Sequence, residues 1–249
     1  MAFKPNFTRK KKRKQHGATF WEAEYNNPSH LKLSTNQSED LEKFTRWILR
    51  DKEKTLLNQS ESVLDVGCGN GRNLIYLAKN FGNTGVGFDI SKSAIAQAVT
   101  ASKDLPINYK ARSIAGHLEL DDESQSLVLD MMTSHFLNKE ERAGLRDEIY
   151  RVLKPGGYLF MKTFLKDEDI HTARLLKEMP GTEIGSYIHP VMGVAEYVYS
   201  EEELTDFLKE KFIIHKIYRS HKHAFRGQAR KRRTITIYAE KDPYQKRPI

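Results

Sequence analysis

The clearest chemistry in the sequence lies between residues 63 and 73, which read VLDVGCGNGRN. An apolar stretch ends at Asp65, three glycines follow at alternate positions, and an amphipathic helix starts directly after them. Glycine has no Cβ and tolerates unusual backbone angles, so a ligand can approach the main chain closely. The first N–H groups of a helix also favour an anionic group such as a carboxylate. We therefore expect a ligand site formed by Asp65, Gly67, Cys68, Gly69, Asn70, Gly71 and Asn73.

Two nucleotide-type ligands compete for this glycine loop. The dinucleotide fingerprint G-x-G-x-x-G/A would require a small residue at position 72, but the chain has Arg72 there. The alternating pattern, an acid followed by G-x-G-x-G, fits S-adenosylmethionine better. A tight strand–helix turn that binds no ligand is the remaining alternative.

Asp89 is the second candidate binding residue. It lies near the end of an apolar strand at 85–90, 18 residues after Gly71. A carboxylate there can accept hydrogen bonds from both hydroxyls of a ribose, and charge-assisted bonds of this kind contribute about 1.5–3 kcal/mol each. Capping of the next helix is the alternative role, but Ser91 already serves that purpose. We expect Asp89 and the adjacent Ile90 to belong to the cofactor site.

In this order and spacing, the motifs resemble those of the class I S-adenosylmethionine-dependent methyltransferases. The resemblance covers roughly residues 40–165 and extends more loosely to residue 240. Asp65 to Gly71 is similar to the family's first motif, Asp89 to its ribose-binding acid, and residues 148–158 to the stretch that leads into its fifth strand. The resemblance implies a Rossmann-like sheet of seven strands and S-adenosylmethionine as the cofactor.

Two positions depart from the family pattern. After the third strand the family usually has an acid that contacts adenine, whereas this chain has Ser113 and Ile114 as the candidate contacts. In the fourth strand the family commonly has Phe-Asp where this chain has Gln125 and Ser126. We expect cofactor binding to survive both changes, with backbone or water contacts in place of the adenine-binding acid.

Candidate catalytic residues follow the fourth strand, in the run LDMMTSHF at residues 129–136. In the fold that the sequence resembles, this strand end faces the methyl group. Asp130, which is also a candidate cofactor contact, or His135 could orient or deprotonate the acceptor. A structural role is the alternative for each. The Asn/Asp-Pro-Pro-aromatic pattern expected for N6-adenine methylation is absent here.

The pattern of apolar residues predicts an α/β fold with a doubly wound, mostly parallel sheet. Strands are expected at residues 62–66, 85–90, 107–111, 127–131 and 158–163, alternating with helices that cover both faces. Two further strands, at 212–218 and 234–238, have no helix between them and should form a C-terminal hairpin that adds one antiparallel strand. The helices include one from Ser38 and two that open with capping boxes, at Asn138 and at Ser200.

The chain is expected to hold one catalytic domain, at residues 19–241. A basic tail that we expect to be disordered, residues 1–18, precedes it, and a short tail, residues 242–249, follows it. Within the domain, residues 164–199 form a long connection placed to act as a lid over the pocket. Residues 219–233 form a basic hairpin loop.

Positive charge gathers at the two ends of the chain. Its net charge is +8, yet seven of the first 14 residues are Lys or Arg with no acid among them, and residues 216–249 hold eleven basic residues. This segregation suggests a polyanion, RNA or another nucleic acid, bound through residues 4–14 and 219–233. A small-molecule acceptor, with the basic ends serving solubility or an acidic substrate, is the alternative. A non-catalytic cofactor-binding protein is a third reading.

The remaining features concern location. A single cysteine, Cys68, cannot form an internal disulfide, which favours a reducing, intracellular setting. No apolar run is long enough for a membrane span, and the N-terminus does not resemble a signal peptide. We expect a cytoplasmic protein without membrane or metal partners. The run at residues 10–14 would serve as a nuclear localisation signal in a eukaryote.

Overall fold

The computed structural model describes residues 17–50, 56–220, 224–225, 228–229, 231–242 and 244. The helices are α1 (Gly17–Asn26), α2 (Glu39–Arg50), α3 (Arg72–Phe81), α4 (Lys92–Ala101), the 3-10 helix η1 (Ser134–Phe136), α5 (Lys139–Val152), α6 (Ile170–Glu178) and α7 (Glu201–Lys209). The strands are β1 (Ser62–Val66), β2 (Thr84–Asp89), β3 (Ile107–Ala111), β4 (Gln125–Met131), β5 (Leu153–Phe164), β6 (Ser186–Ile188), β7 (Ala195–Tyr197), β8 (Phe212–Arg219), β9 (Ala224–Phe225), β10 (Gln228–Ala229) and β11 (Thr234–Lys241).

Seven strands form one sheet in the order β3-β2-β1-β4-β5-β11-β8. The five strands from β3 to β5 are parallel, whereas β11 pairs antiparallel with both β5 and β8. The predicted doubly wound sheet, with a C-terminal hairpin that adds one antiparallel strand, is therefore confirmed. The chain order places the carboxyl ends of β1, β2 and β4 side by side, which is where open α/β sheets bind ligands.

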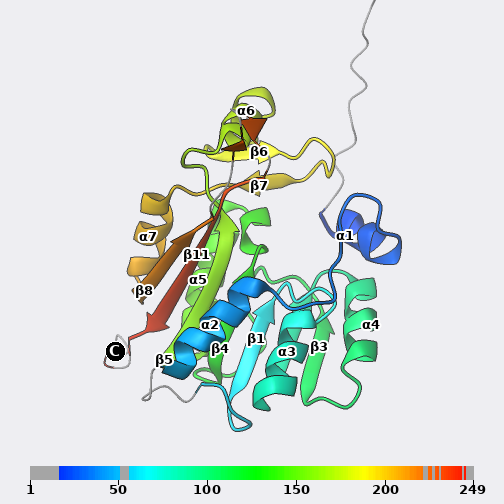
Figure 1. Ribbon diagram of the computed structural model, residues 1–249, viewed down its shortest axis with the longest axis vertical. Helices are drawn as coiled ribbons and strands as arrows, with labels where there is room; N and C mark the ends of the chain where they lie inside the picture. Colours follow the sequence, from blue (N-terminus) through cyan, green and yellow to red (C-terminus); the bar gives the residue numbers. More distant parts are fainter. Residues whose placement is uncertain are drawn as a thin grey trace, which may run out of the picture.

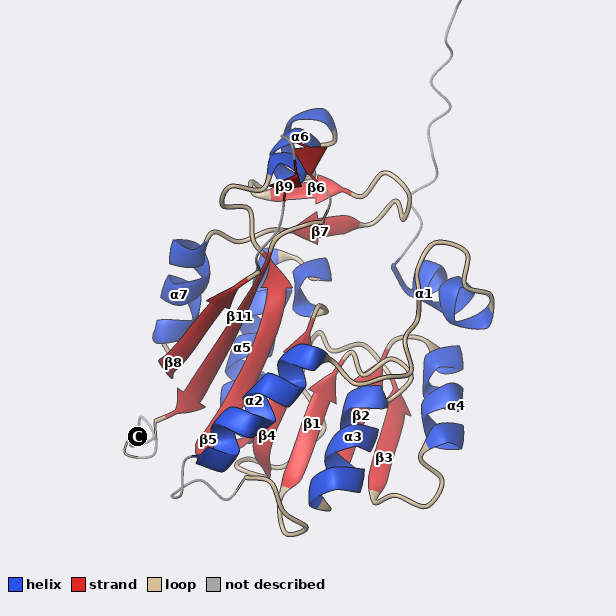
Figure 2. Ribbon diagram, viewed as in Figure 1, coloured by secondary structure: helices blue, strands red, loops and turns tan. Residues whose placement is uncertain are grey.

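Helices cover both faces of the sheet (Figures 1 and 2). In β4, Leu127 and Leu129 enter the apolar cluster that contains α2 and α3, while Val128 enters the cluster that contains α5 and α7. This alternation is the period-two geometry of a strand that is buried on both faces. It also decides on which face each residue at the end of β4 lies.

Local signals place most helix ends where they were expected. Ser91 accepts a hydrogen bond from the Ala94 N–H as the N-cap of α4, and capping boxes are present at Asn138 and at Ser200. One local prediction differs. Strand β5, expected at residues 158–163, begins earlier, at Leu153, because Leu153 pairs with Gln125 ahead of an irregularity in the register.

The lid-like segment 164–199 is folded into α6 and the β6–β7 hairpin. Figure 1 shows this lid and α1 at the end of the sheet to which β1 and β4 point. Helix α1 begins at Gly17, within the stretch expected as tail up to residue 18; the rest of that tail, with basic residues 4–14, lies outside the described residues. None of the described helices is long and apolar enough to cross a membrane.

Candidate cofactor and acceptor site

The glycine loop between β1 and α3 adopts a backbone that only glycine accommodates. Gly67, Gly69 and Gly71 have φ angles of 80°, 55° and 77°. A Cβ at these three positions would lie 2.2–2.4 Å from side-chain atoms of other residues. The loop is also tied to β2, because the N–H groups of Gly67 and Cys68 both donate to the Phe88 carbonyl, at 2.7 and 2.9 Å. The backbone angles therefore favour glycine at all three positions, and the contact with the Thr133 Cβ makes the requirement strictest at Gly67.

Asp89 lies at the end of β2 and joins two neighbouring segments. Its carboxylate accepts hydrogen bonds from the Gly69 N–H and from the Ser91 N–H, both at 2.9 Å. Only 8% of the residue is exposed, and burial raises the pKa of this carboxyl. A carboxylate has about four acceptor sites, so capacity remains for the two hydroxyls of a ribose.

Asp65 lies at the end of β1, beneath the glycine loop. The residue is 1% exposed, and neither carboxylate oxygen has a hydrogen-bond partner in the described part of the chain. Burial first, and then the nearby Asp89, raise the pKa of Asp65 to about 7. A buried carboxylate without a donor is costly, so a cationic or hydrogen-bonding ligand would stabilise it.

The other predicted cofactor residues differ in their surroundings. The Asn70 amide donates to the Ser34 carbonyl at 3.0 Å, and the Asn73 amide faces the Met131 sulfur at 3.3 Å. Cys68 is buried within the loop. Ile90 is 44% exposed. After β3, the Ser113 hydroxyl accepts from its own turn, at the Ala115 N–H, and Ile114 packs in the α5–α7 apolar cluster.

Helix α1 brings residues to this site that the sequence analysis did not select. The Tyr25 hydroxyl lies only 2.2 Å from where a Gly69 Cβ would stand. Glu22 accepts hydrogen bonds from the hydroxyls of Ser91 (2.8 Å) and Ser93 (2.6 Å), at the start of α4. The available signal was the spacing of Trp21 and Tyr25, four residues apart, which places two aromatic rings on one helix face.

A groove of about 470 Å³ lies next to the loop, between α3, α4 and the segment that follows α1. It is lined by Asn70 and Arg72 of the loop, Thr35, and residues of α4. Neither Asp65 nor Asp89 lines it. The groove is therefore on the outer side of the glycine loop, away from the two buried carboxylates.

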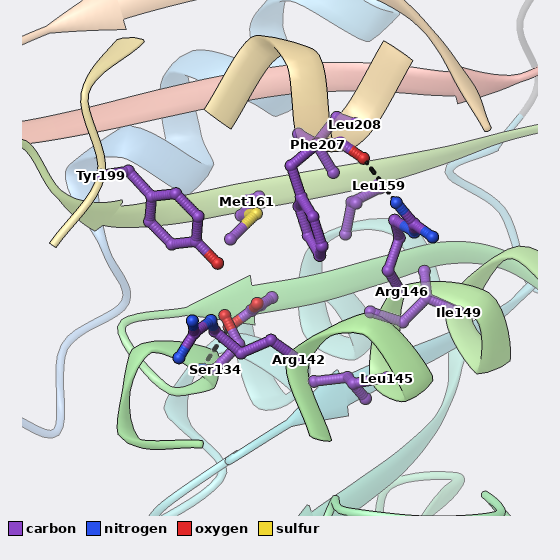
Figure 3. Close-up of a pocket in the computed structure, with 11 residues that line it drawn as sticks. Ser134, Arg142, Leu145, Arg146, Ile149, Leu159, Met161, Tyr199, Phe207 and Leu208 are labelled. Atoms are coloured by element: carbon purple, nitrogen blue, oxygen red, sulfur yellow. Dashed lines mark hydrogen bonds between the residues drawn. The ribbon is translucent and has the colours of Figure 1, made fainter. Parts of the chain in front are cut away.

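Asp130 is placed by the alternation of β4 on the α5–α7 face of the sheet. It is 2% exposed and accepts a hydrogen bond from the Ser134 N–H at 3.1 Å. It lines a small cavity of about 10 Å³ together with Ser134, Arg142 and Tyr199. Figure 3 labels these three residues of the lining. Its catalytic role stays a prediction, and this position favours a role in holding the turn that follows β4.

His135 lies in that turn and is 1% exposed. Neither ring nitrogen has a hydrogen-bond partner among the described residues. The ring stacks on Phe136, with centroids 4.1 Å apart, and meets Phe164 edge-on at 5.1 Å. Burial lowers the pKa of His135 to about 4, so the imidazole is neutral at pH 7. A neutral ring with two free nitrogens can orient an acceptor, whereas its low basicity disfavours strong general-base catalysis.

The titration of Asp130 predicts a pH effect on stability. Burial raises the pKa of Asp130 from 3.8 to about 6, so the folded protein holds this proton more tightly than the unfolded chain. This carboxyl therefore makes the free energy of unfolding fall as the pH rises from about 4 to 6. Asp130→Asn should make that fall less steep by up to about 1.4 kcal/mol per pH unit.

Urea denaturation of both proteins across this pH range, without cofactor, measures the difference. The titration of Asp65 also lowers the free energy of unfolding as the pH rises, whereas the titration of His135 raises it. Both residues are present in the wild type and in the variant, so their effects cancel in the comparison. Parallel curves for the two proteins would show that Asp130 does not titrate as this structure indicates.

Comparison with known proteins identifies a methyltransferase domain in this chain. A family model described as "Methyltransferase domain" matches residues 63–157, which run from β1 through the glycine loop and Asp89 to the start of β5. A solved S-adenosylmethionine-dependent methyltransferase from Methanosarcina mazei superposes with a TM-score of 0.64 at 26% identity, covering 75% of this chain and 94% of that one. Residues 63–157 therefore match a methyltransferase domain, and the fold is that of the class I S-adenosylmethionine-dependent methyltransferases.

Two further methyltransferases resemble this chain, one in sequence and one in structure. The demethylmenaquinone methyltransferase of Oceanobacillus iheyensis is 30% identical over 126 residues, which are 50% of this chain and 53% of that protein. The N-methyltransferase NodS of Bradyrhizobium japonicum, solved with S-adenosyl-L-homocysteine, has a TM-score of 0.61 and covers 91% of this chain and 99% of NodS. At 18% identity, NodS supports the fold alone. The chain spans about half or less of the curated relatives that it matches.

The buried carboxylates of this methyltransferase fit its cofactor. S-adenosylmethionine carries a positive sulfonium and an ammonium group, and Asp65 offers two buried oxygens that lack a donor. Asp89 retains acceptor capacity for the ribose hydroxyls. The glycine loop and the first turn of α3 supply N–H groups for the cofactor's carboxylate. These residues would hold S-adenosylmethionine.

We expect helix α1 to help hold the cofactor in its site, because the hydrogen bonds of Glu22 fix this helix to the start of α4. Hydrogen bonds from Ser93 and Ser91 lower the pKa of Glu22 to about 2, so it is ionised throughout the physiological range. Glu22→Ala should weaken S-adenosylmethionine binding several-fold and speed chymotrypsin cleavage at the aromatic residues of α1. The exposed Glu119→Ala serves as the control. Equal cleavage rates in the variant and in wild type would mean that Glu22 does not hold the helix.

Proposed function

We propose that this protein transfers the methyl group of S-adenosylmethionine to a small organic acceptor. The observation that carries the proposal is an apolar cluster formed jointly by α1, η1 and the lid. Phe20, Met192 and Val194 form its buried part, and Trp21 and Phe136 pack against them, with their rings 5.4 Å apart. This cluster lies beyond the end of β4, where an acceptor would have to approach the methyl group. An apolar surface at this position suits a small organic molecule.

The ion pairs formed by basic residues near the lid support the same proposal. Arg219 pairs with Glu201, Arg232 with Glu196, and Arg233 with Glu168. These three arginines of the 219–233 segment are thus engaged by acids of the same chain. Relatives named for demethylmenaquinone and for ubiquinone biosynthesis also act on small acceptors, as their names state.

The protein's contribution to the reaction would be positional. When bound, S-adenosylmethionine supplies a methyl group already activated by its positive sulfur. Asp89 and the glycine loop would fix the cofactor, while the apolar cluster would exclude water and hold the acceptor. Alignment of two reactants in this way can lower a barrier by about 7–11 kcal/mol in favourable cases. His135 would orient the acceptor, and Asp130 would hold the turn that carries His135.

RNA as the acceptor is the second candidate, based on the charge of residues 4–14 and 219–233. A single experiment separates the two. The protein is incubated with labelled S-adenosylmethionine and a cell extract, which is then divided into RNA and an ultrafiltrate that excludes it. We expect a labelled compound other than S-adenosylmethionine in the ultrafiltrate, separated from the cofactor by chromatography, and no such compound with Asp89→Ala. Label in RNA, with binding that weakens steeply as salt rises, would overturn the small-acceptor proposal.

A further inference from the structure

Arg232 is the arginine of the basic segment that lies deepest in the protein. Its side chain is 16% exposed, and its Nη1 donates to the Glu196 carboxylate at 2.6 Å. Glu196, in β7, is 1% exposed and also accepts a hydrogen bond from the Tyr187 hydroxyl. The guanidinium stacks on the Phe164 ring, with Cζ 3.2 Å from the ring centroid. Arg232 therefore joins the start of β11 to the lid.

One edge of this guanidinium has no hydrogen-bond partner among the described residues. Nε and Nη2 of Arg232 are both buried, and neither makes a hydrogen bond in the described part of the chain. These two nitrogens point their N–H bonds in the same direction, in the geometry that matches the two oxygens of a carboxylate. Because Glu196 uses Nη1 only, the bidentate edge remains available.

Another arginine of this protein, Arg151, has hydrogen-bond partners on both sides of its guanidinium. Arg151 donates from Nη1 to Asp122 at 2.8 Å, and from Nε and Nη2 to the two oxygens of Glu148, each at 2.8 Å. In Arg232, Nη1 donates to Glu196 as Nη1 of Arg151 donates to Asp122. No described acid occupies the Nε–Nη2 edge of Arg232, where Arg151 binds Glu148. A carboxylate on the free edge would complete Arg232 as Glu148 completes Arg151.

The surroundings of that edge place it next to His135. His135 and Arg232 contact the same ring, Phe164, at the end of β5. The charged groups that act on His135 are Glu196, Arg232 and Arg142. They comprise two positive groups and one negative group, while Glu183, the partner of Arg142, is 26% exposed. The excess of positive groups among these three therefore favours an anionic ligand near His135.

We infer that the acceptor carries a carboxylate, and that the Nε–Nη2 edge of Arg232 binds it and determines specificity. This inference rests on the proposed function and names its substrate class. The apolar part of the acceptor packs toward Phe136 and Trp21, and the imidazole of His135 contacts it from η1. Since the edge of Arg232 is covered by the chain here, the acceptor enters when the lid moves away from η1.

The test measures binding of matched acids and amides to the full-length protein saturated with S-adenosyl-L-homocysteine. The probes are a panel of aromatic and aliphatic carboxylic acids, each paired with its primary amide, and calorimetry gives the Kd of each. We expect the best acid to bind at least about tenfold more tightly than its amide. Arg232→Lys keeps the positive charge and the pairing with Glu196 but removes the bidentate edge, and it should abolish this preference. The control Arg219→Lys makes the same exchange at an exposed arginine and should retain it.

Each outcome bears on a distinct claim. Failure of the wild type to bind S-adenosyl-L-homocysteine would overturn the proposed function itself. Cofactor binding without a preference for acids anywhere in the panel would overturn the carboxylate inference and leave the proposed function standing. A preference for acids that persists in Arg232→Lys would assign the anion to another residue. If Arg232→Lys does not fold, the acid–amide comparison in the wild type decides the question alone.

Discussion

Replacing Asp89 with alanine should reduce the affinity for S-adenosylmethionine by at least about 100-fold, since it removes charge-assisted hydrogen bonds that contribute about 1.5–3 kcal/mol each. Two of the remaining acceptor positions of this carboxylate are assigned to the ribose. The substitution also leaves the N–H groups of Gly69 and Ser91 without their acceptor, so the glycine loop loses its tie to the end of β2. Calorimetric titration of the folded variant measures the effect.

Asp89→Asn sharpens this test. The amide keeps the size of the side chain but replaces one oxygen with a donor, which would face either the Gly69 N–H or the Ser91 N–H. We expect weakened binding here as well, whereas Glu119→Ala, an exposed acid outside the site, should bind as wild type does. Wild-type affinity in a folded Asp89→Ala protein would remove Asp89 from the cofactor site and leave the glycine loop in need of another ligand.

Gly67→Ala is expected to abolish measurable cofactor binding. Its backbone lies at φ = 80°, which an alanine adopts only with strain, and the new Cβ would come within 2.2 Å of the Thr133 side chain and 2.7 Å of the Thr133 Cβ. The contact includes a branched carbon next to the backbone, so a rotamer change cannot relieve it. The loop or the β4–η1 connection must shift, and the free energy of unfolding should fall by about 1–3 kcal/mol.

Gly116→Ala is the matched control for this prediction. Gly116 has φ = 84°, but a Cβ there would meet nothing within 4 Å. The two variants share the backbone strain, and only Gly67→Ala adds the contact with Thr133. Chemical denaturation and cofactor titration of both proteins separate the two effects. An equal loss of stability with unimpaired cofactor binding in Gly67→Ala would show that the close packing of the loop against Thr133 is unnecessary.

Tertiary contacts change the role that is expected for the basic residues 219–233. In the sequence, residues 219–233 suggest a surface for polyanions. In the structure, Arg232 is turned inward against Phe164 and Glu196, and Arg219 and Arg233 pair with acids. Part of the positive charge that suggested a nucleic acid is thereby turned inward, where we propose that it binds the carboxylate of the acceptor.

The sequence by itself determined the parts of this protein that depend on neighbouring residues. The strand–glycine–helix unit at residues 63–73, the capping residues Ser91, Asn138 and Ser200, and the single antiparallel strand all follow from local backbone chemistry and from the period of apolar residues. Each needs only a short window of sequence, because the interaction that decides it closes within a few residues. The resemblance of the ordered motifs then pointed to the family and its cofactor.

Tertiary structure alone decided what depends on residues far apart in the chain. The register of β4 sets Asp130 on the α5–α7 face, and α1 meets α4 through Glu22 and Ser91, 69 residues apart. Glu196 and Arg232, 36 residues apart, meet only because the lid folds back over β5 and β11. Such pairs leave no periodic signal, since neither residue constrains its own neighbours. The sequence could therefore predict a cofactor site in the glycine loop, whereas the proposed acceptor site depends on the packing of α1, the lid and β11 together.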